Sequence, residues 1–416
     1  MTRIAFLTLG CKLNYAETST YERNFIKAGL EVVPWQDKAD VYVINTCTVT
    51  ATSDSKSRNL VSKVHRVNPD ALIVVTGCSA QLRRKELEAI EGVSRVFGAT
   101  EKSRVVPETL ALAGVAAPET AGARESIFPA FSSGERTRSF LKVQDGCNNY
   151  CKYCTVPYAR GESRNVPICE CVRNAEAIAA MGIKEIVLTG VNTGDFGRTT
   201  GESFFELIKA LDAVEGIERY RISSIEPNLL TEEIIDWIAS GTKFQPHFHI
   251  PLQTGSDILL ERMGRHYDTA FFASRIDYIR KAMEGPGKPL VFFGIDVMVG
   301  LPGETEELFL DTVEFIRTVR PAFIHVFPYS RRPGTPAADM PGQVPEAEKA
   351  RRVAVLEELC SELHSSFVEA NRGIRGKVLW ESTVREGAME GYTGNYIRLT
   401  RPYDKALVNM VTEETI

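Results

Sequence analysis

The sequence lacks a long uninterrupted apolar run. The longest one, near Val291, is broken by Asp296, so no segment approaches the roughly 20 apolar residues that a membrane span needs. The apolar stretch before Leu9-Gly10-Cys11 is shorter than the roughly 7–15 residues of a signal-peptide core, although the tripeptide resembles the end of a lipoprotein signal. The sequence therefore predicts neither a membrane protein nor an exported one, and it favours a cytoplasmic location.

An excess of positive charge is also missing. The 49 Lys and Arg residues are outnumbered by 54 Asp and Glu, which gives a formal net charge of −5. General attraction to polyanions is therefore excluded, and we expect no DNA binding. Any contact with nucleic acid must come from a local basic patch.

A disulfide framework is not expected either, because the nine cysteines are odd in number and follow no secretory signal. Three of them form the motif Cys147-x3-Cys151-x2-Cys154 after the apolar run 139–144. Thiolates suit zinc and iron–sulfur clusters, and short gaps let one loop wrap a cluster. A closed zinc site needs a fourth ligand, but the next cysteine, Cys169, lies too far along the chain. The motif predicts a cluster with one open iron; a zinc loop or a chance group of buried cysteines is the alternative.

Three more cysteines, Cys11, Cys47 and Cys78, each end an apolar run typical of a buried parallel strand. Because the carboxyl ends of parallel strands share one edge of a sheet, we expect these three side chains to converge there. This predicts a second cluster, again with an open iron. The alternative is that each is a small buried hydrophobic residue. Helical patterns follow the runs at 17–28, 53–67 and 84–90.

The pattern of the chain predicts an α/β protein in three parts. Residues 1–112 form three βα units with a parallel sheet, and residues 113–134 form a linker rich in Ala, Gly, Pro, Ser and Glu. Residues 135–371 form six βα units of a partial TIM-type barrel, and residues 372–416 form a small β-barrel or half-barrel. The predicted barrel strands are 139–146, 185–190, 219–225, 247–253, 290–299 and 323–329, and the last helix is 345–370. In the terminal part we expect strands at 377–382, 390–393, 396–399 and 406–411.

A three-cysteine loop after a first barrel strand resembles the radical S-adenosylmethionine (SAM) enzymes. With the N-terminal cysteines and a C-terminal segment resembling a TRAM domain, nearly the whole chain is similar to the radical SAM methylthiotransferase family, whose members modify tRNA or a ribosomal protein. The resemblance implies a SAM-binding [4Fe-4S] cluster on Cys147, Cys151 and Cys154. It implies an auxiliary [4Fe-4S] cluster that carries or delivers sulfur on the three N-terminal cysteines. One SAM would methylate the sulfur and a second would provide the radical, so that S–CH3 replaces C–H.

SAM itself is expected at the carboxyl ends of the barrel strands. Segments 188–192, 223–226 and 249–253 follow the second, third and fourth strands, and segment 299–304 opens a helix after the fifth. A glycine or proline after a strand is often only a turn, which is the alternative reading. The residues predicted to contact SAM are Gly190, Asn192, Ser224, Glu226 and Gln253.

Arginines and lysines in the predicted barrel and in the terminal part predict RNA contacts, with solvated surface charge as the alternative. The phosphate contacts predicted are Arg372, Arg375, Lys377, Arg331 and Arg332, with Arg160 and Arg164 as further candidates. Tyr158, Tyr392 and Tyr396 are predicted to stack on unpaired bases.

Segments 9–14 (LGCKLN) and 391–397 (GYTGNYI) most resemble the family branch that acts on N6-threonylcarbamoyladenosine. That branch places a methylthio group at C2 of the adenine 3′ of the anticodon, position 37 of tRNA. The resemblance implies three partners: the tRNA anticodon stem-loop, a reductase such as flavodoxin or ferredoxin, and a sulfur donor. The alternatives are the isopentenyladenosine branch, the branch that modifies a ribosomal-protein aspartate, and a non-catalytic iron–sulfur electron carrier.

The remaining cysteines and two histidines receive structural interpretations. Cys169 and Cys171 precede a helix and are predicted to be bystanders, and Cys360 is predicted to lie in the core. His247 and His249 share one face of a strand, which favours packing or substrate contact near the barrel mouth over a metal pair.

Overall fold

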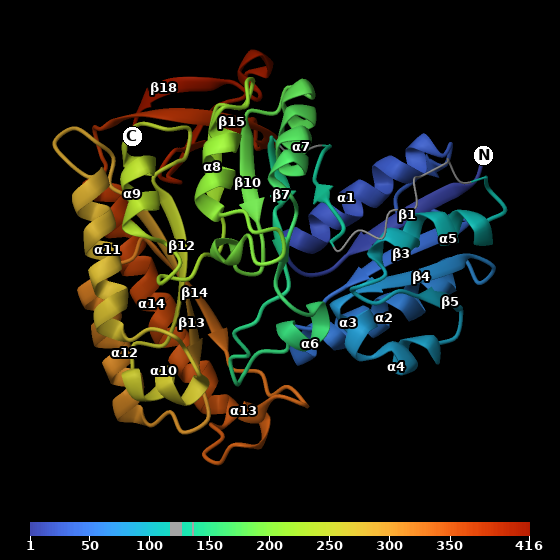
Figure 1. The fold of residues 1–416 in the computed structure, drawn as a ribbon, viewed down its shortest axis with the longest axis horizontal. Coiled ribbons are helices and arrows are strands. Elements are labelled where there is room, and N and C mark those ends of the chain that lie inside the picture. Colours follow the sequence, from blue (N-terminus) through green and yellow to red (C-terminus); the bar gives the residue numbers. More distant parts are fainter. Residues whose placement is uncertain (117–126, 135–136) are drawn as a thin grey trace.

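The computed structural model describes residues 1–116, 127–134 and 137–416, and in it the chain forms three parts (Figure 1). Residues 117–126 of the predicted linker lie outside the described residues. The C-terminal end of the predicted linker, residues 113–134, contains a short strand, β6 (Ala130–Phe131). This strand pairs antiparallel with the first barrel strand, β7 (Arg138–Lys142).

The N-terminal part is a parallel sheet of five strands in the order β2-β1-β3-β4-β5. The three predicted βα units are confirmed. The short edge strands β2 and β5 were not predicted from the sequence, because they have too few residues to show a recognisable hydrophobic pattern. The central strand β3 is apolar and buried along its whole length, as a strand covered on both faces requires. The elements are β1 (Arg3–Thr8), α1 (Lys12–Lys27), β2 (Glu31–Val32), β3 (Val41–Thr46), α2 (Ala51–Val67), β4 (Leu72–Gly77), α3 (Cys78–Leu82), α4 (Arg84–Glu88), β5 (Val93–Val96), η1 (Lys102–Arg104) and α5 (Val105–Leu112).

The middle part confirms the predicted partial barrel of six parallel strands. β7, β10 and β11 pair in one sheet, β12, β13 and β14 pair in another, and isolated bridges between Tyr220 and Phe244 and between Ser224 and His249 join them. Helices cover the outer face, and the large apolar core lies between them and the strands. The elements are β8 (Gln144–Asp145), α6 (Val156–Arg160), β9 (Arg164–Asn165), α7 (Ile168–Ala180), β10 (Glu185–Thr189), η2 (Thr193–Asp195), α8 (Phe204–Asp212), β11 (Arg219–Ile222), α9 (Glu232–Ala239), β12 (His247–Gln253), α10 (Asp257–Met263), α11 (Thr269–Met283), β13 (Phe292–Val299), α12 (Glu306–Val319), β14 (Phe323–Pro328), α13 (Pro336–Asp339) and α14 (Glu346–Ala370).

The C-terminal part is an antiparallel sheet in the order β17-β16-β15-β18, so it is an open half-barrel whose edges are β17 and β18. The strand predicted at 406–411 is wrong. The side chain of Asp404 accepts a hydrogen bond from Ala406 N and starts a turn there, and the strand begins only at Val411. The elements are β15 (Arg375–Arg385), β16 (Ala388–Thr393), β17 (Arg398–Pro402), η3 (Lys405–Leu407) and β18 (Val411–Thr415).

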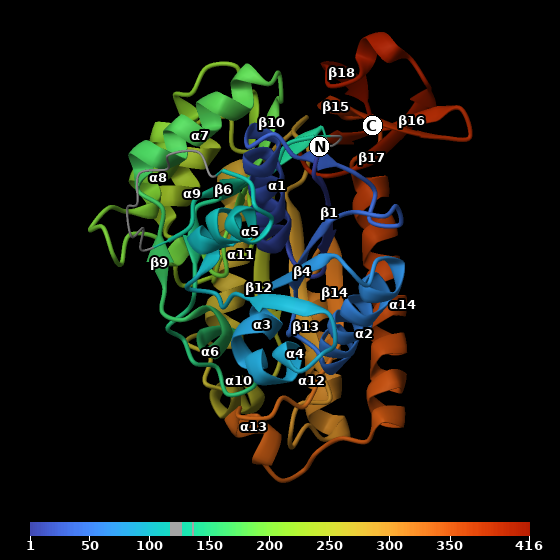
Figure 2. The same ribbon diagram turned by 90° about the vertical axis from the view of Figure 1, so that its right-hand side faces the viewer.

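The barrel is open on one side, and the other two parts lie against it there and at one end. Helix α1 packs on β6 and β7, which places the N-terminal sheet beside the open edge (Figures 1 and 2). The C-terminal sheet lies over the amino ends of the barrel strands, whereas α6, α10 and α13 lie at their carboxyl ends. None of the helices in the described ranges is long and apolar enough to cross a membrane.

Candidate functional site

The loop with Cys147, Cys151 and Cys154 leaves the carboxyl end of the first barrel strand and leads into α6. Its path is fixed at Gly146, where φ is +74° and an added Cβ would lie 2.0 Å from a backbone oxygen of Glu162. Backbone amides already point at two of the sulfurs. Asn149 N lies 3.5 Å from Cys147 Sγ, and Val156 N lies 3.4 Å from Cys154 Sγ. The loop therefore surrounds its thiols with donors that suit a cluster.

Burial disfavours free thiolates in this loop. It raises the pKa of Cys147 to about 11 and that of Cys154 to about 12. A bound metal centre deprotonates its thiol ligands outright, so three shielded thiols in one loop fit a cluster better than they fit an exposed redox pair. The third, Cys151, accepts a hydrogen bond from Arg265 Nη1 at 3.2 Å. A cation at the sulfur compensates the negative charge that a thiolate-bound cluster carries.

The segment predicted to hold SAM is tied directly to the cysteine loop by Gln144. Its Oε1 accepts hydrogen bonds from the backbone N–H groups of Val191 and Asn192 at 2.9 and 3.0 Å, and its Nε2 donates to the Gly146 carbonyl at 2.8 Å. A side chain at Gly190 would meet Gln144 Oε1 at 2.9 Å, so this glycine is needed for the close approach. Gln144 therefore joins the two loops through its side chain.

Unsatisfied polar atoms mark the same region. Asn192 Nδ2 and Ser223 Oγ are buried and have no hydrogen-bond partner in the described part of the chain. Gln253 has φ +71°, a left-handed conformation that is strained for a non-glycine residue and is often found at ligand sites. Such atoms fit a site that a polar ligand completes.

Of the other residues predicted to contact SAM, Glu226 pairs with Arg265 at 2.7 Å, the same arginine that reaches Cys151. Ser224 forms the bridge between β11 and β12. The structure thus brings the predicted set, Gly190, Asn192, Ser224, Glu226 and Gln253, to the carboxyl ends of β10, β11 and β12, beside the cysteine loop.

The three N-terminal cysteines also lie at one edge of their sheet. Thr46 in β3 is paired with Gly77 in β4, so Cys47 and Cys78 follow at matching positions. A Cβ on Gly10 would lie 3.1 Å from Cys47 Sγ, which places the turn before Cys11 against that sulfur. The order β2-β1-β3-β4-β5 is flavodoxin-like, in which ligands bind at the switch point between β1 and β3. Cys11 and Cys47 follow those two strands.

Burial differs among these cysteines. Cys47 and Cys78 are buried, and burial raises the pKa of Cys78 to about 11. Cys11 is exposed and lines the large cavity described below. The set therefore forms a site with a closed side in the sheet and an open side toward the barrel.

A buried ionic network connects the two cysteine sites, and sequence reasoning missed it. Lys102 and Lys142 lie 2.6 and 2.8 Å from Glu17 Oε1, and Lys142 lies 2.7 Å from Asp145 Oδ2. Burial alone would raise the pKa values of Glu17 and Asp145, but the surrounding lysines and Arg160 outweigh it and hold both pKa values low. Nothing in the sequence pattern pairs these residues, because they come from both the N-terminal part and the barrel.

Arg160 belongs to this network, although it was predicted to contact RNA phosphate. Its side chain is buried; Nη1 lies 2.9 Å from Asp145, and Nη2 donates to Asn14 and approaches Cys11 Sγ at 4.0 Å. It therefore faces the N-terminal cysteine site from the barrel side.

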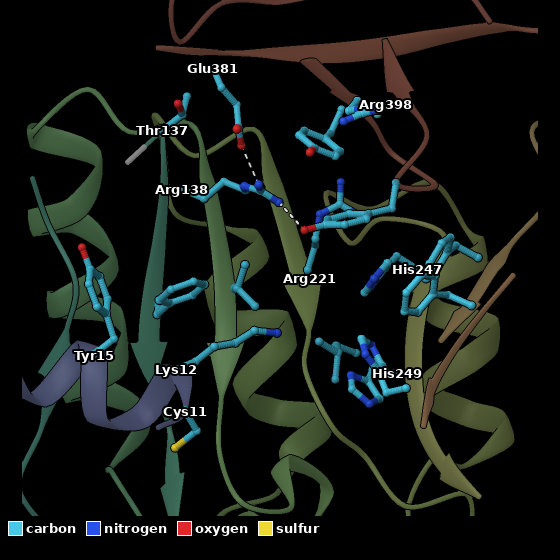
Figure 3. Close-up of a pocket in the computed structure, with 18 of the residues that line it drawn as sticks. Cys11, Lys12, Tyr15, Thr137, Arg138, Arg221, His247, His249, Glu381 and Arg398 are labelled. Carbon is cyan, nitrogen blue, oxygen red and sulfur yellow. Dashed lines mark hydrogen bonds and ion pairs between the residues drawn. The ribbon is translucent and has the colours of Figure 1, made fainter. Parts of the chain in front are cut away.

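A cavity of about 1000 Å³ lies at the centre of the molecule, where all three parts meet (Figure 3). Cys11 and Lys12 form its wall on the N-terminal side, the barrel contributes residues from the amino-terminal and middle parts of its strands, and the C-terminal sheet covers it. The cavity thus reaches the barrel from the end opposite the predicted SAM contacts. Among its lining residues are Arg138, Arg221, His247, His249, His325, Tyr392 and Tyr396.

Three arginines line the cavity, and each is already paired. Arg398 lies 3.3 Å from Glu390. Arg138 donates to Tyr396 Oη at 2.8 Å and pairs with Glu381, and Arg221 lies 2.8 Å from Glu185 and donates to two carbonyl groups of the C-terminal part. Lys12 is different. Its side chain reaches solvent within the cavity and has no hydrogen bond or ion pair with any described residue, while burial and then Arg138 lower its pKa.

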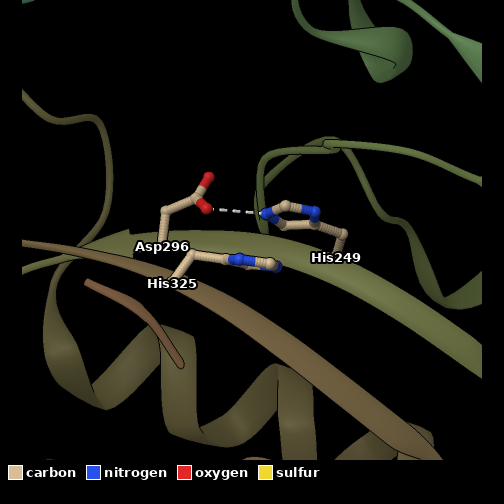
Figure 4. Close-up of side chains that lie close together, drawn as sticks. All are labelled: His249, Asp296 and His325. Atoms are coloured by element: carbon tan, nitrogen blue, oxygen red, sulfur yellow. Dashed lines mark hydrogen bonds and ion pairs between the residues drawn. The ribbon is translucent and has the colours of Figure 1, made fainter. Parts of the chain in front are cut away.

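His249, Asp296 and His325 form a small cluster in the same cavity region (Figure 4). Their potential ligand atoms lie within 4.8 Å of one another, and His249 Nε2 is 2.8 Å from Asp296 Oδ1. However, the two rings stack with their centroids 5.0 Å apart, and burial, His249 and then the charge of Lys12 lower the pKa of His325. Stacked rings and a nearby cation disfavour a divalent metal. His247 stacks on Phe292, so both histidines singled out in the sequence line the cavity.

The residues predicted to contact RNA lie in different environments. Arg332 is buried and pairs with Asp54 of the N-terminal part, so it stabilises a domain contact instead of presenting charge to RNA. Arg331, Arg372 and Arg375 are exposed and pair with neighbouring carboxylates. Lys377 is exposed. Cys171 and Cys360 lie in the barrel core, whereas Cys169 is exposed.

This geometry, a three-cysteine loop on a partial barrel of six parallel strands with buried polar atoms beside it, defines a radical SAM protein. The comparisons agree. Residues 141–316 match the model of the radical SAM superfamily, and residues 3–98 match that of the uncharacterized protein family UPF0004. The fold resembles that of the radical SAM methyltransferase TsrM from Kitasatospora setae, with a TM-score of 0.59, 15% identity and coverage of 81% of this chain and 75% of that chain.

Relatives with named activities show which family within the radical SAM superfamily the chain is similar to. The chain is 41% identical to the threonylcarbamoyladenosine tRNA methylthiotransferase MtaB of Bacillus subtilis, over 96% of this chain and 90% of that protein. It is 37% identical to MtaB of Aquifex aeolicus, over 98% and 99%. It is 34% identical to the tRNA-2-methylthio-N(6)-dimethylallyladenosine synthase of Desulfosudis oleivorans, over 93% and 83%. The chain belongs to the radical SAM methylthiotransferase family.

Proposed function

We propose that this protein is the tRNA methylthiotransferase that places a methylthio group at C2 of N6-threonylcarbamoyladenosine, next to the anticodon. Near full-length relatives from several bacteria carry this activity in their names, at 35–41% identity. The observation that carries the proposal is Cys11, which faces the central cavity while Cys47 and Cys78 lie buried behind it. A sulfur held at that site can meet a base that enters the cavity.

Cys147, Cys151 and Cys154 would hold the SAM cluster, and Gly190, Asn192, Ser224, Glu226 and Gln253 would hold SAM. When bound, the cluster and SAM supply a carbon radical and a methyl group, which acid–base residues cannot provide at an aromatic C–H bond. The chain's own part is to bind and shield. The orphaned Asn192 Nδ2 offers a donor to the ligand, and Gln144 keeps the two loops together.

Cys11, Cys47 and Cys78 would hold the auxiliary cluster. The register of β3 and β4 and the close approach of Gly10 to Cys47 support a shared metal centre. Arg160 lies on its barrel side, where a cation offsets the charge of the thiolates.

The base must leave its stack to reach this cavity, as other base-modifying enzymes require. Lys377, Arg372, Arg375 and Arg331 are the exposed cations that remain as phosphate contacts. A reductase such as flavodoxin or ferredoxin would supply the electron, and a separate donor would replace the sulfur. A tRNA substrate and nine free thiols are consistent with a cytoplasmic location.

Three cysteine variants test the proposal. The protein is reconstituted anaerobically with iron and sulfide and given dithionite, SAM and tRNA, and the nucleosides are analysed by mass spectrometry. Cys147→Ala should form neither 5′-deoxyadenosine nor product. Cys47→Ala should still form 5′-deoxyadenosine but no methylthio-nucleoside, because only the sulfur site is lost. Cys169→Ala, at an exposed cysteine outside both sites, should match the wild type. Product formation by Cys47→Ala would contradict the assignment of the auxiliary site.

A further inference from the structure

We propose that the ammonium group of Lys12 binds the carboxylate of the threonylcarbamoyl group and so selects this modified adenosine. The inference rests on the proposed function, because it names the contact that the substrate makes in the cavity. It concerns a single residue between the sulfur site and the barrel (Figure 3).

The first argument is the pairing of charges in the cavity wall. Arg138 is held by Glu381 and Tyr396, and Arg221 is held by Glu185 and by carbonyl groups of the C-terminal part. Both of these arginines fix the C-terminal sheet over the barrel, and the third arginine of the wall, Arg398, pairs with Glu390. Lys12 makes no such contact with the residues that the structure describes, so its three N–H donors remain available to a ligand.

The second argument is that the nearby carboxylate is already engaged. Asp296 accepts a hydrogen bond from His249 at 2.8 Å, and this histidine stacks on His325. Lys12 therefore faces a polar wall without a direct partner. The cations that act on this space, Lys12, Arg138 and Arg221, favour an anionic group over a metal ion.

The third argument is position. Lys12 directly follows Cys11, whose side chain also lines the cavity, and it is the first residue of α1. A substrate carboxylate bound to Lys12 would be held next to the proposed sulfur site. The same adenosine without its acidic group, or with an isopentenyl group, offers no charge to this ammonium and would leave it unpaired.

The experiment compares three anticodon stem-loops that differ only at position 37: N6-threonylcarbamoyladenosine, its methyl ester and unmodified adenosine. Binding to the cluster-loaded protein is measured by fluorescence anisotropy. We expect the wild type to bind the free acid about 10- to 100-fold more tightly than the ester, which is the range for a charge-assisted hydrogen bond. Lys12→Met should remove this preference, and Lys12→Arg should keep most of it.

Lys27→Met is the matched control, because it makes the same change at an exposed position at the other end of α1. It should bind all three RNAs as the wild type does. The iron content of Lys12→Met should stay at the wild-type level, which separates lost recognition from a damaged cluster.

Two results would overturn the inference while leaving the proposed function intact. One is a wild-type protein that binds acid and ester equally and still forms the methylthio product. The other is a Lys12→Met variant that keeps the wild-type preference for the acid. If the wild type forms no product on the free acid and binds it no better than unmodified adenosine, the proposed function itself fails.

Discussion

The guanidinium of Arg160 lies 2.9 Å from the carboxylate of Asp145, and this pair links the two cysteine sites. Asp145 comes two residues before Cys147, and Arg160 also donates to Asn14 and approaches Cys11. One buried network therefore holds the N-terminal sheet and the barrel in a fixed relation. Such a relation is needed if a sulfur from one site must meet a radical from the other.

The network makes stability depend on pH. The lysines and Arg160 hold the pKa of Glu17 at about 2, below the value of about 4.3 expected in the unfolded chain. Its contribution to stability is thus complete above about pH 4.5 and is lost as the pH falls toward 2. Glu17→Gln should lower the free energy of unfolding by about 3 to 5 kcal/mol at pH 7, because it leaves buried lysines uncompensated. Urea denaturation of the metal-free protein measures this.

Two further results would follow for this variant. Between pH 5 and pH 3 the stability of Glu17→Gln should fall less steeply than that of the wild type, since the titrating group is gone. Glu369→Gln is the control, because Glu369 pairs with Arg372 on the surface, and it should cost less than about 1 kcal/mol. Equal pH dependence in the wild type and Glu17→Gln would show that the network does not contribute as described.

The backbone of Gln253 has a strained conformation of the kind that often occurs at ligand-binding sites. Its left-handed backbone is strained, so Gln253→Gly should stabilise the protein by about 1 kcal/mol. The same change removes the amide that we predict to contact SAM, and SAM affinity should fall by about tenfold. Thermal denaturation and equilibrium dialysis with labelled SAM measure the two effects. A variant that binds SAM with unchanged affinity would exclude Gln253 as a contact.

Arg265 should raise the reduction potential of the SAM cluster. It donates to Cys151 Sγ and pairs with Glu226, so its charge lies beside the expected cluster. A nearby cation stabilises the reduced, more negative form, and its removal should make the reduction potential more negative. We expect Arg265→Met to have a lower midpoint potential than Arg265→Lys, which keeps the charge. A redox titration followed by EPR measures both, and identical potentials would argue against this role.

Lys377 and Arg332 should behave differently in RNA binding. Lys377 is exposed, and as a phosphate contact its replacement by Ala should weaken tRNA binding and reduce the slope of log K against log salt by about 1. Arg332 is paired with Asp54 in the interior, so Arg332→Met should leave that slope unchanged and lower the thermal midpoint. Binding titrations at several salt concentrations test this. A reduced slope in Arg332→Met would place this arginine at the RNA after all.

The sequence was sufficient for the architecture because its signals are local. Each barrel strand is an apolar run followed by a helical pattern, and the cysteines after β1, β3 and β4 mark one sheet edge. Where a single side chain redirects the chain, as Asp404 does before β18, the pattern placed the strand too early. The short strands β2 and β5 are defined by their neighbours in the sheet and not by a period of their own.

The site was harder to predict from the sequence than the fold. The sequence suggested that Arg160 and Arg332 are surface cations, because charged residues are seldom buried without partners. Glu17 and Asn14, which contact Arg160, and Asp54, which contacts Arg332, are far away in the chain. Lys12 follows Cys11 directly in the sequence, yet only the fold shows that it faces a cavity between the three parts of the chain. The position of that cavity, at the amino ends of the strands, also depends on the C-terminal sheet that covers it.

The central claim is that this chain modifies threonylcarbamoyladenosine in tRNA, and substrate competition tests it most directly. The reconstituted protein is given SAM, dithionite and equal amounts of two tRNAs that carry N6-threonylcarbamoyladenosine or N6-isopentenyladenosine next to the anticodon. Mass spectrometry of the digested RNA then compares their methylthio derivatives. We predict 2-methylthio-N6-threonylcarbamoyladenosine as the dominant product. A product formed mainly on the isopentenyl tRNA, or SAM cleavage with neither tRNA modified, would contradict the account.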